Sequence, residues 1–312
     1  PRLRRQRQMC IRDSCRCVIE LVLFELYKMN FKVKTYNAIA ETGISLLKES
    51  KFSVSDSEDS PDAMILRSFK LTDQDIESSI KAIARAGAGV NNVPVDLCSK
   101  NGIVVFNTPG ANANAVKEIV LAGLLLSSRG IYSGANYVND IEGIDSDDLK
   151  GHIEQGKKHF KGRELKDGVL GVIGMGAIGA KVADMGVMLG MDVIGYDPAI
   201  SVEAAWKLPN MVSRRDNLES VFAEADYLTL HIPALDETKN LVNEDLLNNA
   251  KQGLKLINFA RDEIVDSKAV IDALNSGKLG GYVTDFADLD LIERAKTKGD
   301  VIILPHIGAS TR

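Results

Sequence analysis

The sequence Gly168-Val-Leu-Gly-Val-Ile-Gly-Met-Gly-Ala-Ile-Gly179, followed by Met191-Asp-Val-Ile-Gly-Tyr-Asp197, decides the fold of this chain. An apolar run leads directly into the glycines, as a buried parallel strand would. Apolar residues then recur at helical spacing up to Leu189, and a second apolar run ends in an acid 18 residues after the last glycine of the turn. The order predicts a strand, a glycine-rich turn, a helix and a second strand.

Each part of this pattern has a function in dinucleotide binding. Gly174 permits the tight turn, Gly176 lets the backbone approach a pyrophosphate, and Gly179 lets the helix pack close to the strand. The helix begins at Ala177 and Ile178, where its N-terminal N–H groups and partial positive charge can meet the phosphates.

The acid that ends the second strand points to the cofactor. Asp197 would accept hydrogen bonds from the adenosine ribose hydroxyls and repel a 2′-phosphate, so the sequence predicts NAD rather than NADP. The alternative is a strand–helix–strand unit without a ligand, and the terminal acid argues against it.

The totals exclude several classes of protein. With 312 residues, 45% hydrophobic and 26% charged, the chain is long enough for two domains. A net charge of −5 argues against nucleic acid as the main partner, and no apolar run approaches the ~20 residues that span a bilayer. Of the four cysteines only Cys98 lies in the body of the chain, where no Cys/His grouping has zinc-ligand spacing. We therefore expect a cytoplasmic protein with no metal site and no membrane partner.

Residues 1–28 differ from the rest. They carry a charge of +4, against −9 for the remainder, and three of the four cysteines. A signal peptide and a mitochondrial presequence are alternatives, but acids such as Glu20 and Glu25 interrupt the apolar segment. We expect this stretch to be a non-native extension that precedes a native start at Met29.

The next segment, residues 29–111, predicts a small α/β domain for binding the substrate. Its expected strands are 31–36, 63–67, 83–86 and 103–107, and its expected helices are 40–48, 72–80 and 95–100. The helix at 72–80 rests on Thr72-Asp-Gln-Asp75, which resembles a capping box.

Residues 112–312 predict the NAD domain. A long helix at 114–129, capped by Asn112 or Asn114, precedes a polar connection at 132–161. Six strands alternate with helices, so we expect a doubly wound parallel sheet, Rossmann-like, beside the smaller α/β domain. The strands after the first two are expected at 227–232, 254–259, 282–286 and 301–304, and the helices at 177–189, 218–224, 243–250 and 267–276.

Polar residues gather where the last four strands end. Ligands of open α/β sheets bind beyond these carboxyl ends, so the groups are candidate site residues. They are His231-Ile232-Pro233, Asn258-Phe259-Ala260-Arg261, Asp285, and Pro305-His306-Ile307-Gly308-Ala309.

Several of these segments resemble those of the D-isomer-specific 2-hydroxyacid dehydrogenases, most closely the phosphoglycerate dehydrogenase branch. The resemblance covers nearly all of the chain from Met29 to Thr311. It is carried by Arg85-Ala-Gly-Ala-Gly-Val-Asn-Asn-Val93, Val105-Phe-Asn-Thr-Pro-Gly110, the glycine turn, Asn258-Phe-Ala-Arg261 and Pro305-His-Ile-Gly-Ala-Ser-Thr311.

The resemblance implies a role for each chemical group. His306 would move the hydroxyl proton as general acid/base while hydride passes to or from the nicotinamide. Arg261 would hold the substrate carboxylate by a planar two-point contact and polarise the carbonyl. Asp285 would bind the nicotinamide carboxamide. The remaining cofactor contacts are expected from Ile232, Pro233, Phe259, Ala260, Gly308 and Ala309, with His231 beside them.

The substrate contacts are expected from the small domain. The amides of Ala88, Gly89 and Val90 would cradle the substrate carboxylate, and Arg67, at a strand end, would meet a substrate phosphate. A surface salt bridge is the alternative interpretation of Arg67.

Two departures from the family matter. The family's catalytic Glu, about 20 residues before the His, has no matching motif here; Asp288, Asp290 and Glu293 are the candidates to replace it. The chain also ends before the helix that returns to the small domain, so we expect a fragment.

The leading hypothesis is oxidation of 3-phospho-D-glycerate by NAD, the entry to serine synthesis, by a homodimer or higher homo-oligomer. One alternative is another D-2-hydroxyacid dehydrogenase, such as a glyoxylate or hydroxypyruvate reductase. The other is a non-catalytic NAD-sensing module, against which the pairing of Arg261 with His306 argues.

Overall fold

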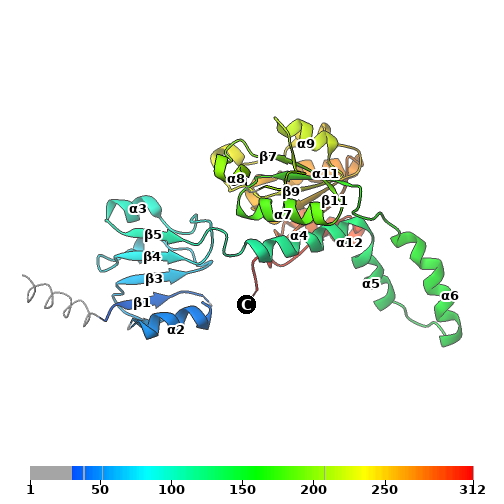
Figure 1. Ribbon diagram of the computed structural model, residues 1–312. Coiled ribbons are helices and arrows are strands. Elements are labelled where there is room, and N and C mark those ends of the chain that lie inside the picture. Colours follow the sequence, from blue (N-terminus) through cyan, green and yellow to red (C-terminus); the bar gives the residue numbers. More distant parts are fainter. Residues whose placement is uncertain (1–29, 38, 51, 207, 312) are drawn as a thin grey trace, which may run out of the picture. The chain divides into compact units, whose positions relative to one another are not determined.

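The computed structural model describes residues 30–37, 39–50, 52–206 and 208–311. The hypothesis about residues 1–28 lies outside these residues. The chain divides into two compact units between Thr108 and Pro109. Each unit is built on a parallel sheet with helices packed against it (Figure 1). This confirms the predicted α/β class, while the assignment of substrate and cofactor to the two units stays a prediction.

The first unit is a five-stranded sheet in the order β2-β1-β3-β4-β5. This is a doubly wound order, so the unit has its own carboxyl edge at which loops gather. Its core includes Met64, Leu66, Ile83 and the free thiol of Cys98. The elements are β1 (Lys32–Thr35), α2 (Glu41–Glu49), β2 (Ser53–Ser55), β3 (Ala63–Leu66), β4 (Ala82–Arg85), α3 (Val95–Lys100) and β5 (Val104–Asn107).

The helix predicted at 72–80 is wrong. Only a 3-10 turn, η1 (Asp73–Asp75), forms there. The capping box itself exists, because the Thr72 N–H donates to Asp75 Oδ2 at 2.7 Å. The residues that follow include Ser78 and Ser79, which favour helix weakly, so the apolar pair Ile76 and Ile80 at helical spacing does not extend the turn into a helix. The edge strand β2 was not predicted because its sequence is polar and short.

The second unit is a seven-stranded parallel sheet in the order β12-β11-β10-β9-β6-β7-β8. This is the dinucleotide-binding order extended by one strand. Its strands are β6 (Val169–Ile173), β7 (Asp192–Tyr196), β8 (Ser213–Arg214), β9 (Tyr227–Leu230), β10 (Leu254–Asn258), β11 (Leu279–Thr284) and β12 (Val301–Ile303).

Helices cover both faces of this sheet. The long helix α4 and the fingerprint helix α7 pack on one face, and α9, α10 and α11 pack on the other (Figure 1). Two further helices, α5 and α6, stand between α4 and β6 in the sequence and extend away from the sheet (Figure 1). The helices are α4 (Ala113–Ser128), α5 (Ile131–Asn139), α6 (Ser146–Gly156), α7 (Ala177–Met188), α8 (Val202–Trp206), α9 (Leu218–Glu224), α10 (Glu244–Asn248), α11 (Ser267–Asn275) and α12 (Leu289–Lys298), with short 3-10 turns η2 (Lys157–Phe160), η3 (Asp236–Thr238) and η4 (Asp262–Ile264).

Five helices and strands of this unit were not predicted: α5 and α6, which form in the segment expected to be a polar connection, and β8, α8 and α12. The strand β8 has only two residues, both exposed, so it carries no apolar pattern. The helix α12 begins after Asp288, whose side chain accepts the N–H groups of Asp290 and Leu291 and so caps it. Within the described residues, no helix is both long enough and apolar enough to cross a bilayer.

Candidate active site

The turn after β6 requires glycine at two positions. Gly174 has φ of 88°, and a Cβ there would lie 2.5 Å from the carbonyl oxygen of His231. A Cβ at Gly179 would lie 1.8 Å from the carbonyl oxygen of Gly174. Both separations are far below van der Waals contact, so the backbone can follow this path only without side chains.

The third glycine of the motif meets a different situation. A Cβ at Gly176 would have no heavy atom within 4 Å. The open space lies at the N-terminus of α7, where Ala177 and Ile178 form the first turn. Helix N-termini present unpaired N–H groups to anions, so a pyrophosphate fits the space that a Cβ would fill.

Asp197 follows β7 at the same edge and is held by the backbone. Its Oδ2 accepts the N–H of Met175 at 2.8 Å, and its Oδ1 accepts the N–H of Ala199 at 2.9 Å. Each oxygen keeps a further lone pair, because a carboxylate oxygen accepts two hydrogen bonds. The carboxylate is therefore both fixed beside the glycine turn and able to accept a ribose hydroxyl.

His231 ends β9 next to the glycine turn. Burial lowers the pKa of His231 to about 3, so its imidazole is neutral near pH 7. Its Nε2 lies 3.1 Å from the hydroxyl of buried Thr229. A neutral imidazole without a charged partner is a wall of the site rather than a proton carrier. Ile232 and Pro233 continue the chain from it.

Arg261 lies just after β10, in a loop shaped by Asn258. The fully buried Asn258 side chain donates to the carbonyl of Arg261 at 2.8 Å and accepts the N–H of Ala260 at 3.1 Å. The Arg261 guanidinium donates to the carbonyl of Ala260 at 2.6 Å. Phe259 is buried below the loop. The sequence placed Asn258 in this polar group but assigned it no role of its own.

The support for Asn258 continues into β11. Asn258 pairs in register with Thr284, and the hydroxyl of Tyr282 hydrogen-bonds to both side chains. Burial raises the pKa of Tyr282 to about 12, so this hydroxyl keeps its proton. Only the strand register brings these residues together, and the sequence holds no signal for it.

Asp285 follows β11 and is 3% exposed. Its Oδ2 accepts the N–H of Gly308 at 3.0 Å, while its Oδ1 is buried with no hydrogen-bond partner. Burial raises the pKa of Asp285, and the Gly308 N–H and the charges of His306 and Arg261 partly offset this. A buried acceptor without a donor fits a ligand N–H group, such as that of a carboxamide.

His306 follows β12 in a left-handed backbone conformation, with φ of 49°. Its N–H donates to the carbonyl of Leu304 at 2.9 Å, and its ring meets Phe286 edge-on at 5.2 Å. The side chain is exposed, and Ala309 continues the same loop. The strained loop and the Phe286 ring present the imidazole at the carboxyl edge.

The three candidates to replace the missing Glu lie on or beside α12. Asp288 caps the helix, Asp290 is in its first turn and Glu293 is in its middle. In the part of the chain that the structure describes, no hydrogen bond or ion pair joins any of them to His306. The carboxyl group that His306 does influence electrostatically is Asp285.

The candidate substrate residues belong to the first unit and lie at its carboxyl edge. Arg67 follows β3, and its carbonyl accepts hydrogen bonds from Arg85 Nε and Asn92 Nδ2. Ala88, Gly89 and Val90 form the loop after β4, where Asn107 Nδ2 donates to the carbonyl of Ala88 at 2.7 Å. Asn107, in β5, thus ties the start of this loop, and Asn92, farther along the loop, ties it to the segment after β3.

Comparisons with known proteins agree with this architecture. Residues 131–308 match the family described as D-isomer specific 2-hydroxyacid dehydrogenase, NAD binding domain. D-3-phosphoglycerate dehydrogenase of Synechocystis sp. is 35% identical over 306 residues, which cover 93% of this chain and 52% of that protein. Hydroxypyruvate reductase of Thermotoga maritima is 35% identical over 258 residues, which cover 80% of this chain and 78% of that protein.

A solved structure extends the likeness to three dimensions. NAD+-bound 3-phosphoglycerate dehydrogenase of Entamoeba histolytica has a TM-score of 0.71 and 27% identity, over 91% of this chain and 89% of that one. The present chain spans about half the length of the D-3-phosphoglycerate dehydrogenases it matches, 52% and 54% for two of them. The predicted family and its cofactor, NAD, are confirmed. The chain belongs to the family of D-isomer-specific 2-hydroxyacid dehydrogenases, to whose NAD-binding domain residues 131–308 are similar.

Proposed function

We propose that the protein oxidises a D-2-hydroxy acid with NAD, and that its substrate is 3-phospho-D-glycerate, which becomes 3-phosphooxypyruvate. The observation that carries the proposal is the grouping around Asp285. The N–H of Gly308, two residues after His306, donates to this buried carboxyl group at 3.0 Å, and the charges of His306 and Arg261 both act on it. Oxidation of a hydroxy acid needs a base that takes the hydroxyl proton and a cation that binds the carboxylate. His306 and Arg261 are these two groups, and both lie near Asp285.

NAD supplies the hydride acceptor when bound. His306 takes the proton of the substrate hydroxyl, because imidazole is the side chain whose ordinary titration range suits proton transfer near neutral pH. Arg261 holds the substrate carboxylate through two parallel hydrogen bonds. Asp285 Oδ1, which is buried without a hydrogen-bond partner, would hold the nicotinamide carboxamide through its N–H and so fix which ring face meets the substrate.

The substrate preference rests on the first unit and on the relatives. Arg67 is the cation proposed for the phosphate, and the Ala88–Val90 amides are proposed for the carboxylate. Relatives that carry the name D-3-phosphoglycerate dehydrogenase are 31–35% identical to this chain. We place the enzyme in the cytoplasm as a homodimer or higher homo-oligomer that acts on a small molecule.

A second candidate is reduction of hydroxypyruvate or glyoxylate. It is favoured by the Thermotoga maritima hydroxypyruvate reductase, since this chain covers 78% of that protein rather than about half.

The deciding experiment follows NADH absorbance with 3-phospho-D-glycerate, D-glycerate and D-lactate in one direction, and hydroxypyruvate and glyoxylate in the other. We expect the largest kcat/KM with 3-phospho-D-glycerate. Arg67→Leu should raise KM for this substrate about tenfold or more and leave D-glycerate nearly unchanged, because only the phosphate is lost as a partner. Preference for hydroxypyruvate supports the second candidate. NAD binding without any turnover points instead to a sensing module.

A further inference from the structure

A cavity of about 580 Å³ opens at the amino ends of the strands in the second unit. Its wall includes Gly168 before β6, Asp226 before β9, Lys255 in β10 and Asp300 before β12. The glycine turn and the candidate catalytic side chains all follow the carboxyl ends of the strands. The cavity is therefore a separate place on the opposite edge of the sheet, and its volume suits a small molecule.

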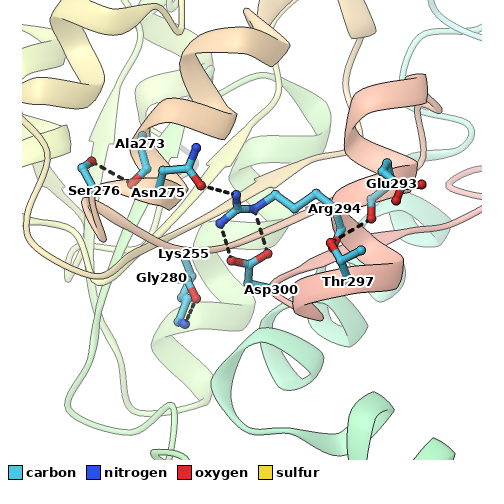
Figure 2. Close-up of polar contacts among 9 residues, drawn as sticks. All are labelled: Lys255, Ala273, Asn275, Ser276, Gly280, Glu293, Arg294, Thr297 and Asp300. Carbon is cyan, nitrogen blue, oxygen red and sulfur yellow. Dashed lines mark hydrogen bonds and ion pairs between the residues drawn. The ribbon is translucent and has the colours of Figure 1, made fainter.

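Lys255 lies across two glycines of the neighbouring strand. A Cβ at Gly280 would lie 2.8 Å from Lys255 Nζ, and one at Gly281 would lie 3.4 Å from Lys255 Cδ. The lysine ammonium donates to the carbonyl of Gly280 (Figure 2). Burial lowers the pKa of Lys255, and the charge of Asp300 opposes this. The two glycines thus give a half-buried cation the room to lie in the cavity wall.

Asp300, the carboxylate whose charge acts on Lys255, already has a partner. Arg294, 10% exposed, binds both oxygens of Asp300 at 2.9 and 2.7 Å and also donates to Asn275 at 2.6 Å. Figure 2 shows this fork on Asp300 with Lys255 and Gly280 nearby. No ion pair of Lys255 occurs among the described residues. A partly buried charge without a counter-ion is costly, and a bound anion would remove that cost.

The remaining wall has the same imbalance. Asp226 is neutralised by Lys251 at 2.8 Å and also accepts the N–H of Val169 at 3.0 Å. Although burial opposes it, these contacts lower the pKa of Asp226, so the carboxylate stays ionised. The other charged side chains of the wall form no ion pair with another described residue, and basic ones outnumber acidic ones: Arg129, Lys161, Arg163, Lys166 and Lys298 against Glu164 and Asp167.

We propose that this cavity binds a small anion carrying two or more phosphate or carboxylate groups, with Lys255 at its floor and the basic side chains of the rim around it. The chain as a whole has a net charge of −5, so a wall with excess positive charge is a local feature and not a reflection of composition. The site does not depend on the proposed catalytic function, because its wall contains none of the residues proposed for cofactor, substrate or catalysis.

The test is calorimetric titration of the full chain with pyrophosphate and, in a second arm, with citrate, at constant ionic strength. Lys255→Met should weaken binding of the preferred anion at least about tenfold, the loss expected for a charged hydrogen bond. The matched control Lys268→Met removes an exposed lysine on α11, outside the cavity, and should change nothing. The arm with the tighter binding identifies phosphate or carboxylate as the recognised group.

Gly176→Val separates the two possible anion sites. A valine there fills the space at the N-terminus of α7, so pyrophosphate bound at the coenzyme turn would be lost, whereas binding in the cavity would persist. Arg163→Gln, at the exposed rim, tests the cavity if Lys255→Met fails to fold. This variant should bind the preferred anion about threefold more weakly than the parent. The proposal is overturned by unchanged affinity in both cavity variants, by a loss confined to Gly176→Val, or by absence of binding heat with both anions.

Discussion

The carboxyl edge of the large sheet is built in two ways. Around β6 and β7 it consists of backbone: Gly174 and Gly179 leave no room for a side chain, and the N-terminus of α7 faces open space. Around β10, β11 and β12 it consists of side chains, with Arg261, Asp285 and His306 at successive strand ends. In the first half, a side chain added at Gly174 or Gly179 should disturb the backbone that binds the cofactor. In the second half, a changed functional group should disturb the chemistry. Substitutions should therefore separate cofactor binding from chemistry.

The largest effect is expected at His306. His306→Ala should lower kcat at least about 100-fold, the lower limit for loss of a general acid/base, with a much smaller change in NAD affinity. Because His306 has φ of 49°, His306→Asn is the companion variant, since Asn tolerates this backbone. Equal losses in both variants assign the effect to the imidazole. Steady-state kinetics of the full-length protein measure it, and full activity in either variant would remove His306 from the mechanism.

The carboxylates of α12 provide the comparison for this result. Asp288→Ala should lower the free energy of unfolding by about 1 kcal/mol, because the helix loses its cap, and should change turnover little. Glu293→Gln, in the exposed middle of the helix, should change neither. A loss as large as that of His306→Ala at either position would identify it as the acid that replaces the family's Glu.

The next effect is expected from substitutions of the glycines in the backbone half, around β6 and β7. Gly179→Ala places a Cβ 1.8 Å from a carbonyl oxygen, so it should destabilise the fold by about 1–3 kcal/mol and abolish NAD binding. Gly176→Ala is the matched control, because its Cβ meets no protein atom within 4 Å. It should leave the melting temperature unchanged and weaken NAD only. Thermal unfolding with and without NAD measures both, and equal melting temperatures for the two variants would contradict the steric argument.

The two halves also differ in how far the sequence predicts them. The glycine turn follows from local rules, since glycine geometry, apolar period and a terminal acid all lie within 30 residues. The Asn258 support does not, because it depends on the register that sets Asn258 opposite Thr284 on another strand. The helix α12 was missed for a related reason. Its apolar residues are few, so the only local signal for it is the Asp288 cap.

A smaller effect concerns cofactor choice at Asp197. Asp197→Asn keeps an oxygen for the N–H of Met175 but removes the charge that repels a 2′-phosphate. NADP affinity should rise relative to NAD, and the ratio between them should narrow about tenfold. Fluorescence titration with NADH and NADPH measures the ratio. Equal affinities in the unmodified protein would contradict the role of Asp197, and a loss of both in the variant would show that the tether to Met175 matters more than the charge.

The smallest effect is expected at Asp285, the buried carboxyl group of the side-chain half. Burial raises the pKa of Asp285, so folding disfavours its ionised form. The associated stability is fully present below the pKa of the unfolded chain, near 3.8, and is lost as the pH rises through the higher folded value. Asp285→Asn removes this titration, so its free energy of unfolding should depend less on pH between neutrality and about pH 4 than that of the parent. Urea unfolding across this range measures the difference. Identical pH dependence in parent and variant would mean that a solvated or ligand-paired carboxylate, and not a desolvated one, lies beside His306.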